Sequence, residues 1–297
     1  MTPARLDTEL VRRGLVRSRT RAAALVAGGH VRVGGAVVTR AAHPVEVTDV
    51  LDVDQPGSAY VSRAAHKLAG ALDALADVPG APDPHGRWCL DAGASTGGFT
   101  QVLLERGAAH VWAVDVGHGQ LDPVVAADPR VTSREGVNVR DLRVGDLPRP
   151  ADLVVADLSF ISLRLVVGPL VDAAAPGADL LVMVKPQFEV GRERLARTGV
   201  VTSPDLRHEA VAAVADAART AGAQLRAVVP SLLPGENGNH EYFLWLTRPA
   251  AVQGSDDTPR GTERVALRVR EAVRRAVVDG ATALVVEDVH GVPRRTA

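Results

Sequence analysis

The feature that most constrains the fold is the stretch WCLDAGASTGGFT at residues 88–100. Its first four residues end in Asp91 and are typical of a buried strand, the glycines that follow are typical of a tight turn, and Phe99 and Thr100 begin a helix. We expect Ser95 or Thr96 to cap that helix. Glycines let backbone N–H groups approach a ligand closely, so the turn is a candidate cofactor cradle. The alternative is a strand-to-helix turn that binds nothing.

The spacing of these glycines disfavours two classes of nucleotide site. It is not G-x-G-x-x-G, and no Gly-Lys-Ser/Thr follows, so neither a dinucleotide site nor a P-loop is expected. An acid at the end of the strand suits a nucleoside without a pyrophosphate, and S-adenosylmethionine is the predicted cofactor. Asp115 ends the next strand, where an acid can hold ribose hydroxyls, and Asn138 is either an adenine contact or a turn residue. The predicted cofactor-binding residues are Asp91, Gly93, Ser95, Thr96, Gly97, Gly98, Phe99, Asp115 and Asn138.

Strand and helix patterns alternate from residue 88 onward, which is typical of a parallel, doubly wound sheet. The expected strands are 88–91, 110–115, 131–134, 151–157, 178–185, 224–229 and 241–246. We expect the last two to pair antiparallel and to close the edge of the sheet. The predicted fold class is therefore α/β, with a mostly parallel seven-stranded sheet.

The N-terminal segment is strongly basic, although the whole chain has a net charge of −1. Residues 4–45 contain eight arginines against Asp7 and Glu9, a net charge of +6 that leaves −7 on the rest. Two short helices are expected before Gly14 and over 19–27, followed by a small sheet at 30–33, 37–38 and 45–47. A small basic α+β domain joined to an acidic remainder of the chain favours a nucleic-acid-binding domain, since arginine suits bidentate phosphate contact. The alternative is that the arginines reflect a biased composition and only lie on solvent-exposed helix faces.

Charged residues also follow the apolar strands. Asp157 and Lys185 each end a predicted strand, and the carboxyl ends of parallel strands meet at one edge of a sheet. Burying a charge is costly unless it is paired, so a purely structural ion pair between them is one interpretation. Lys67, at the margin of the apolar stripe of a predicted helix, and Glu241, at the head of the last strand, extend the set to four alternating charges. That pattern favours a catalytic site.

Five segments carry a resemblance to a known family: SRAAHKL at 62–68, DAGASTGGFT at 91–100, DLSFIS at 157–162, KPQFE at 185–189 and GNHEYF at 238–243. With the basic N-terminal domain, they make the chain similar to the TlyA (hemolysin A-like) family. The family joins an S4-like RNA-binding domain to a Rossmann-like, RrmJ/FtsJ-like ribose 2′-O-methyltransferase domain with a Lys-Asp-Lys-Glu tetrad. The resemblance extends to about Gly280, and linker 55–60 departs from the family pattern.

The resemblance implies S-adenosylmethionine-dependent 2′-O-methylation of cytidine in ribosomal RNA of the small and, in some members, the large subunit. The tetrad residues would be Lys67, Asp157, Lys185 and Glu241, with no metal. A ribose hydroxyl is a weak nucleophile, so Lys185 would act as the base, Asp157 would position it, Lys67 would steady the oxygen, and Glu241 would hold the lysines or the ribose. The RNA-binding residues would be Arg5, Arg19, Arg21 and Arg32.

The predicted organisation is an S4-like domain at 1–55, a linker and helix carrying Lys67 at 56–84, a methyltransferase domain at 85–250, and a linker, helix and tail at 251–297. The single cysteine, Cys89, excludes an intrachain disulfide and a cysteine-based zinc site. No apolar run is long enough to span a membrane. We therefore expect a cytoplasmic monomer that binds ribosomal RNA or ribosomal subunits. The alternative is an S4-type RNA-binding protein with another RNA target or a catalytically silent methyltransferase domain.

Overall fold

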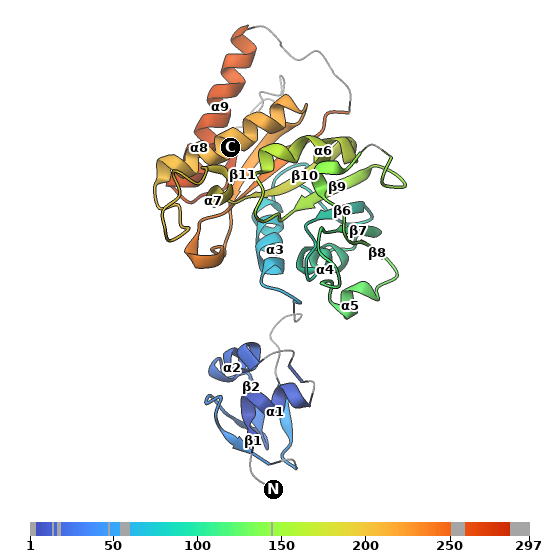
Figure 1. Cartoon of the computed structure of the whole chain (residues 1–297), viewed down its shortest axis with the longest axis vertical. Helices are drawn as coiled ribbons and strands as arrows, with labels where there is room; N and C mark the ends of the chain where they lie inside the picture. The colour runs from blue at the N-terminus through green and yellow to red at the C-terminus, as the bar shows by residue number, and fades with distance from the viewer. Residues whose placement is uncertain are drawn as a thin grey trace, which may run out of the picture. The chain divides into compact units, whose positions relative to one another are not determined.

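The computed structural model describes residues 4–13, 15–16, 19–46, 48–53, 60–143, 145–250 and 259–285, without the side chains of 21, 236 and 259–264. The chain divides into two compact units, Met1–Ala59 and Tyr60–Ala297. Figure 1 shows the elements of both, and each unit is described by itself.

The first unit packs two short helices against small antiparallel sheets. Its helices are α1 (Leu6–Arg12) and α2 (Arg19–Ala27), and its strands are β1 (Ala4–Arg5), β2 (Val31–Val33), β3 (Ala36–Val37), β4 (Pro44–Val45) and β5 (Leu51–Val53). The three-stranded sheet has the order β3-β2-β5, while β4 pairs with β1. The expectation that a strand at 45–47 joins the hairpin is therefore wrong, and residue 47 lies outside the described residues. The apolar core includes Leu6, Leu10 and Leu25.

The second unit is built on an eight-stranded sheet of order β13-β11-β12-β10-β9-β6-β7-β8. Its strands are β6 (Trp88–Ala92), β7 (His110–Val114), β8 (Val131–Arg134), β9 (Ala151–Ala156), β10 (Ala174–Val184), β11 (Gln224–Pro230), β12 (Tyr242–Thr247) and β13 (Ala283–Leu284). Strands β10, β9, β6, β7 and β8 are parallel to their neighbours in that order. The predicted α/β class and mostly parallel sheet are confirmed, as is the antiparallel pairing of β11 with β12.

The sheet has one strand more than the seven expected from the sequence. β13 pairs antiparallel with β11 through Ala283 and Leu284, in a region predicted to hold only a linker, a helix and a tail. Two residues are too few to show the alternation that identifies a strand. β11 is covered on its outer side by β13, so the expectation that the strands at 224–229 and 241–246 close the edge of the sheet is wrong.

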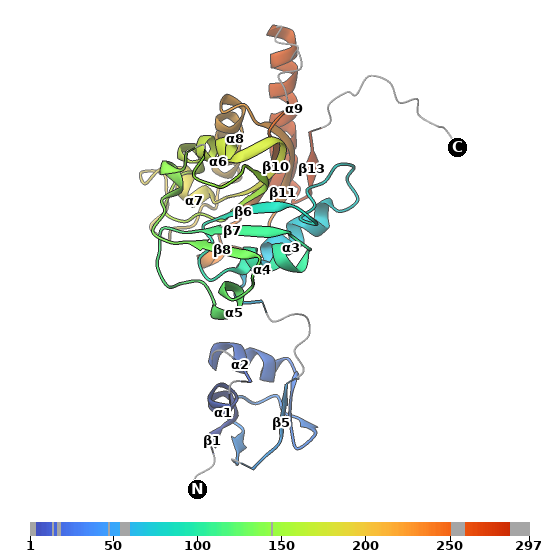
Figure 2. The ribbon, with the colours of Figure 1, turned by 90° about the vertical axis from the view of Figure 1, so that its right-hand side faces the viewer.

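Helices cover both faces of the sheet (Figures 1 and 2). On one face, α3 (Ala64–Leu75) and α4 (Gly98–Glu105) pack Leu68 and Leu103 against strand residues such as Val155. On the other, α6 (Val167–Ala173), α8 (Pro204–Thr220) and α9 (Pro259–Val278) share a core with residues such as Val154. The shorter helices are α5 (Pro123–Ala126), α7 (Pro186–Glu189), η1 (Val139–Asp141), η2 (Leu163–Leu165) and η3 (Glu236–Gly238).

The direction of β12 matters for the site. It runs antiparallel to β10, with Val184 opposite Tyr242 and Asp179 opposite Thr247. The beginning of β12 therefore lies at the edge where the parallel strands end. Because of this, Glu241, just before β12, lies at the same edge as Lys185, just after β10.

Candidate active site

The end of β6 holds a buried acid. Asp91 is fully buried, and its Oδ2 accepts a hydrogen bond of 2.7 Å from the Thr100 hydroxyl. Its other oxygen, Oδ1, has no hydrogen-bond partner within the described part of the chain. Burial raises the pKa of the Asp91 carboxyl to about 7, against the opposing effect of the bond from Thr100. Such a group suits a cationic or hydrogen-donating ligand.

The turn after β6 leads into α4 without a side-chain cap. Its N-cap is Gly97, in the left-handed region at φ 91°, and it forms no side-chain capping bond, so the expected cap by Ser95 or Thr96 is wrong. The Ser95 N–H instead donates to Asp115 Oδ2 at 2.8 Å. The Thr96 carbonyl accepts from the N–H of Asp122. The first N–H groups of α4 have no partner inside the helix and can bind an anionic group.

Two of the glycines are required by the packing of the chain on itself. A Cβ atom on Gly93 would lie 2.8 Å from the carbonyl oxygen of Asp157, and one on Gly98 would overlap the Ser62 side chain. The turn after β6 therefore lies directly against the end of β9 and the residues that precede α3. These contacts bring the predicted cradle beside Asp157 and beside the start of α3, the helix that carries Lys67.

The remaining predicted cofactor residues have partners inside the protein. Asp115 accepts the N–H groups of Ser95 and Gly117, at 2.8 and 2.7 Å, which leaves each carboxylate oxygen with a further lone pair. Asn138 caps η1 by accepting from the Arg140 N–H, as a turn asparagine does. The Phe99 ring is buried in the core, with its centroid 6.0 Å from that of Phe243. Only the backbone of Phe99 is therefore available to a ligand at the turn.

The four charged residues form two ion pairs. Lys67 Nζ lies 2.5 Å from Glu241 Oε2, and their side chains are 7% and 2% exposed. Lys185 Nζ lies 2.7 Å from Asp157 Oδ1, and those side chains are 11% and 15% exposed. Lys185 also donates to the Ser159 hydroxyl at 2.8 Å. Both pairs lie at the edge where the parallel strands end, and Asp157 of the second pair lies against the glycine turn.

The loop before β12 holds Glu241 in place. The carbonyl of Glu241 accepts from the N–H of Ser231, and Gly235 lies so close to the Glu241 carboxylate that a Cβ there would overlap it. The Arg63 guanidinium donates to the carbonyl of Pro234 at 2.5 Å. The loop is thereby joined to the start of α3, which carries Lys67.

Sequence reasoning assigned no role to Ser159 or Glu189. Besides the contact of Ser159 with Lys185, the buried Glu189 carboxylate accepts from the Ser162 hydroxyl, the Leu163 N–H and the Arg164 Nε–H, at 2.5, 2.7 and 3.3 Å. Both residues lie in the segments that carry the family resemblance, and this was the only available signal. Which residue of one segment meets which of the other depends on the tertiary fold.

In the first unit, two of the four predicted RNA-binding arginines lie beside a buried acid, Asp7. Arg5 and Arg19 approach Asp7, at 2.9 and 3.4 Å, while the Arg32 side chain is exposed on β2 and that of Arg21 is not described. The guanidinium of Arg5, with that of Arg19, holds the pKa of the Asp7 carboxyl well below its usual range. Asp7, counted in the sequence only as an opposing charge, thus orients two arginines.

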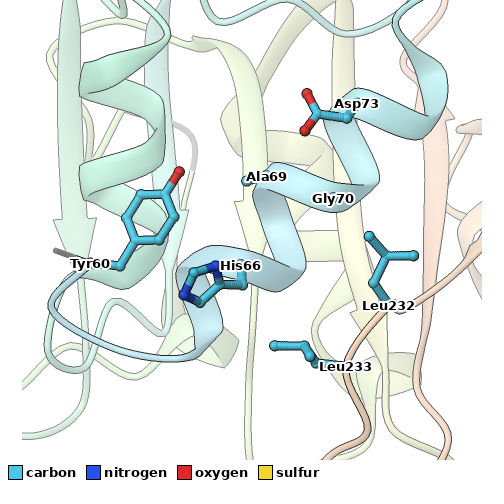
Figure 3. Close-up of a pocket in the computed structure, with 7 residues that line it drawn as sticks. All are labelled: Tyr60, His66, Ala69, Gly70, Asp73, Leu232 and Leu233. Carbon is cyan, nitrogen blue, oxygen red and sulfur yellow. The ribbon is translucent and has the colours of Figure 1, made fainter. Parts of the chain in front are cut away.

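A separate pocket of about 560 Å³ lies at α3 (Figure 3). A Cβ on Gly70 would lie 2.5 Å from Leu232, so the loop after β11 touches the helix here. The lining residues are Tyr60, His66, Ala69, Gly70, Asp73, Leu232 and Leu233. None of the predicted site residues lines this pocket.

The described residues contain no cluster of histidine, cysteine or acidic side chains that could hold a metal ion. Among the same residues, no helix combines the length and the apolar character needed to cross a membrane.

Comparisons with known proteins agree with this architecture. The FtsJ-like methyltransferase model matches residues 60–248, and the S4 domain model matches residues 4–51. The chain is 49% identical over 282 residues to the 16S/23S rRNA (cytidine-2′-O)-methyltransferase TlyA of Mycobacterium tuberculosis, covering 93% of this chain and 98% of the relative. It is 34% identical over 244 residues to Hemolysin A of Brachyspira hyodysenteriae, covering 80% and 98%.

A solved structure named "Putative hemolysin from Streptococcus thermophilus" is also similar, with a TM-score of 0.63 and 29% identity, covering 93% of this chain and 98% of that one. An S4 domain followed by an FtsJ-like methyltransferase domain is thus shared along nearly the whole chain. The chain belongs to the TlyA family of FtsJ-like methyltransferases.

Proposed function

We propose that the protein uses S-adenosylmethionine to methylate the ribose 2′-hydroxyl of cytidine in ribosomal RNA. The observation that carries the proposal is that two lysine–carboxylate pairs lie where the strands end and that the glycine turn after β6 packs against Asp157, a member of one pair. The 49% identity to a protein named 16S/23S rRNA (cytidine-2′-O)-methyltransferase supports the choice of substrate.

The residues around the turn fit the proposed cofactor. The unpartnered, buried Oδ1 of Asp91 can accept from the amino group of the methionine part, while the N-terminus of α4 suits its carboxylate. Asp115 has lone pairs for the ribose hydroxyls. Gly93, Ser95, Thr96, Gly97, Gly98 and the backbone of Phe99 would form the turn around it, with Asn138 near the adenine. When bound, the cofactor supplies an electrophilic methyl group.

Lys185 is the proposed base that removes the proton of the 2′-hydroxyl. To act as a base, the lysine nitrogen has to be uncharged, with two N–H groups and one lone pair. Asp157 and Ser159 can accept from the two N–H groups, which leaves the lone pair to take the proton of the substrate hydroxyl. Lys67 supplies positive charge as the oxygen becomes negative, and Glu241 holds Lys67 in place.

The first unit would bind the RNA. Arg5, Arg19, Arg21 and Arg32 are the proposed phosphate contacts, and Asp7 orients two of them. In our proposal residues 1–55 provide this grip, 56–84 connect it to the helix that carries Lys67, 85–250 perform the methyl transfer, and 251–297 form a C-terminal extension. Phosphate contacts give affinity without reading the base.

The test is transfer of a labelled methyl group from S-adenosylmethionine to isolated small subunits, large subunits and protein-free ribosomal RNA. We expect labelled 2′-O-methylcytidine after digestion to nucleosides, and transfer lowered at least about 100-fold with Lys185→Ala. Label on a base, or no transfer to any of the three RNAs, would contradict the proposal.

A further inference from the structure

Two loops at the proposed catalytic edge are joined to each other at more than one place. The first follows β9 and contains Asp157, Ser159 and Ser162, and the second follows β10 and contains Lys185 and Glu189. Lys185 contacts Asp157 and Ser159 near the strands. One helical turn further on, Glu189 contacts Ser162. The loop after β9 is therefore held on both sides of its central residues.

The buried Glu189 carboxylate depends on its hydrogen bonds to the loop after β9. Its side chain is 1% exposed, so its charge depends on hydrogen bonds from the protein. Those bonds come from three consecutive residues of the other loop, Ser162, Leu163 and Arg164. Two of the donors are a backbone N–H and a short side chain, which fix the position of the backbone itself.

The held loop contains a strained residue. Phe160 lies between Ser159 and Ser162 in the left-handed region, at φ 63°, which a residue with a bulky side chain rarely adopts. Strain of this kind persists only where the surroundings hold the backbone firmly. The hydrogen bonds to Glu189 begin two residues after Phe160, at Ser162, and Ser159, which Lys185 contacts, comes directly before Phe160.

We infer that Glu189 is a positioning residue for methyl transfer, which sets Asp157 and Ser159 against Lys185 without touching the substrate. The inference rests on the proposed role of Lys185 as the base. In this inference Glu189 fixes the distance between the two loops. That distance determines the direction in which the Lys185 nitrogen faces the substrate hydroxyl.

The experiment compares Glu189→Ala, Glu189→Asp, Glu189→Gln and Ser162→Ala in the full-length protein. Glu209→Ala is the matched control, because Glu209 forms an exposed ion pair with Arg194 on the same unit. We would measure kcat, the KM for ribosomal RNA, the Kd for S-adenosylmethionine by calorimetry, and the melting temperature of each variant.

We expect kcat to fall about 10- to 100-fold in Glu189→Ala and Glu189→Asp, since small misplacements of catalytic groups have effects of that size. Aspartate keeps the charge but is too short to reach Ser162. Glutamine keeps the length and can still accept from Leu163 while donating to Ser162, so Glu189→Gln should retain most of kcat. KM and Kd should stay within about twofold, because the loops are displaced rather than removed.

A kcat of Glu189→Ala within twofold of the parent would overturn the inference. So would losses of kcat and of cofactor binding that both follow the folded fraction, which would indicate a purely structural role. If Glu189→Ala does not fold, Ser162→Ala decides: a reduced kcat supports the inference, and an unchanged kcat overturns it. Methyl transfer by Lys185→Ala close to that of the parent would contradict the proposed role of Lys185, whereas a strongly impaired Lys185→Ala beside normal Glu189 variants would contradict only this inference.

Discussion

The two lysine–carboxylate pairs have the same chemistry but different surroundings. Lys67 and Glu241 are 174 positions apart, join α3 to the start of β12, and are almost completely enclosed. Lys185 and Asp157 retain 11% and 15% exposure, and Ser159 shares the lysine. Removing one member of an enclosed pair leaves an unpaired charge that water cannot reach. The comparison predicts that the first pair contributes more to the stability of the fold than the second, whereas the proposed proton transfer depends on Lys185 in the second.

The largest expected effect is on catalysis by Lys185→Ala. Loss of a general base lowers methyl transfer by roughly 10²- to 10⁴-fold. The melting temperature should stay close to that of the parent, because water can solvate the remaining Asp157. Single-turnover rates, calorimetric melting and cofactor titration would be measured on the same preparation. A variant that melts early yet keeps full activity per folded molecule would make this pair structural too.

The next effect is on stability, in Lys67→Met. Breaking an enclosed pair by removing one partner costs about 3–5 kcal/mol, and the free energy of unfolding measured by urea denaturation should fall accordingly. The double variant Lys67→Met with Glu241→Gln removes both charges and should recover part of the loss. If Lys67→Met and Lys185→Ala lowered the free energy of unfolding equally, the two pairs would not differ in their contribution to stability.

Asp91 extends the comparison to a buried carboxylate that forms no ion pair with any described residue. Its pKa is raised to about 7 in the folded protein by burial. The folded state therefore keeps a proton that the unfolded state releases, and stability falls as pH rises from about 4 to about 7. Over this window the free energy of unfolding should drop by roughly 4 kcal/mol on account of Asp91.

The variant Asp91→Asn should remove this part of the pH dependence and weaken the binding of S-adenosylmethionine. Urea denaturation at pH 5 and pH 8 would measure the pH dependence of stability. The control is Asp216→Asn, because Asp216 lies on the exposed side of α8. The same slope of stability against pH in Asp91→Asn and in the parent would show that another group is responsible.

The smallest effect on stability is expected in the first unit, where the arginine side chains are mostly exposed. Arg19 is 62% exposed and lies 3.4 Å from Asp7, a pair that water screens. Arg19→Ala should leave the melting curve nearly unchanged and weaken RNA binding. If Arg19 contacts one phosphate, the slope of log affinity against log salt concentration should flatten by about one. An unchanged slope would exclude a phosphate contact.

Much of the second unit could be predicted because its strands are long and apolar and end in charged residues. From the same pattern, an ion pair between Asp157 and Lys185 was one of the interpretations of the sequence. The partner of Glu241 was left open between the lysines and the ribose, since it depends on where α3 packs relative to β12. The structure pairs it with Lys67.

Other features were out of reach for a physical reason. Ala283 and Leu284 form a strand only because β11 offers them an unpaired edge. Gly93 and Gly98 were interpreted as openings for a ligand, but contacts with Asp157 and Ser62 already require them. Such requirements arise between segments that are distant in the sequence, where neither propensity nor periodicity carries a signal.

The antiparallel course of β12 has a consequence for the order in which the protein matures during its synthesis. The core of the first unit, from Leu6 to Leu51, lies in the earliest part of the chain to be made. Lys67 follows soon after, but Glu241 emerges only after another 174 residues, and contacts between such distant residues close late. A growing chain therefore completes its proposed RNA grip well before Lys67 has a partner. Under the proposed roles, RNA binding could begin on a partly made chain, whereas methyl transfer would have to wait until the last strands have joined the sheet.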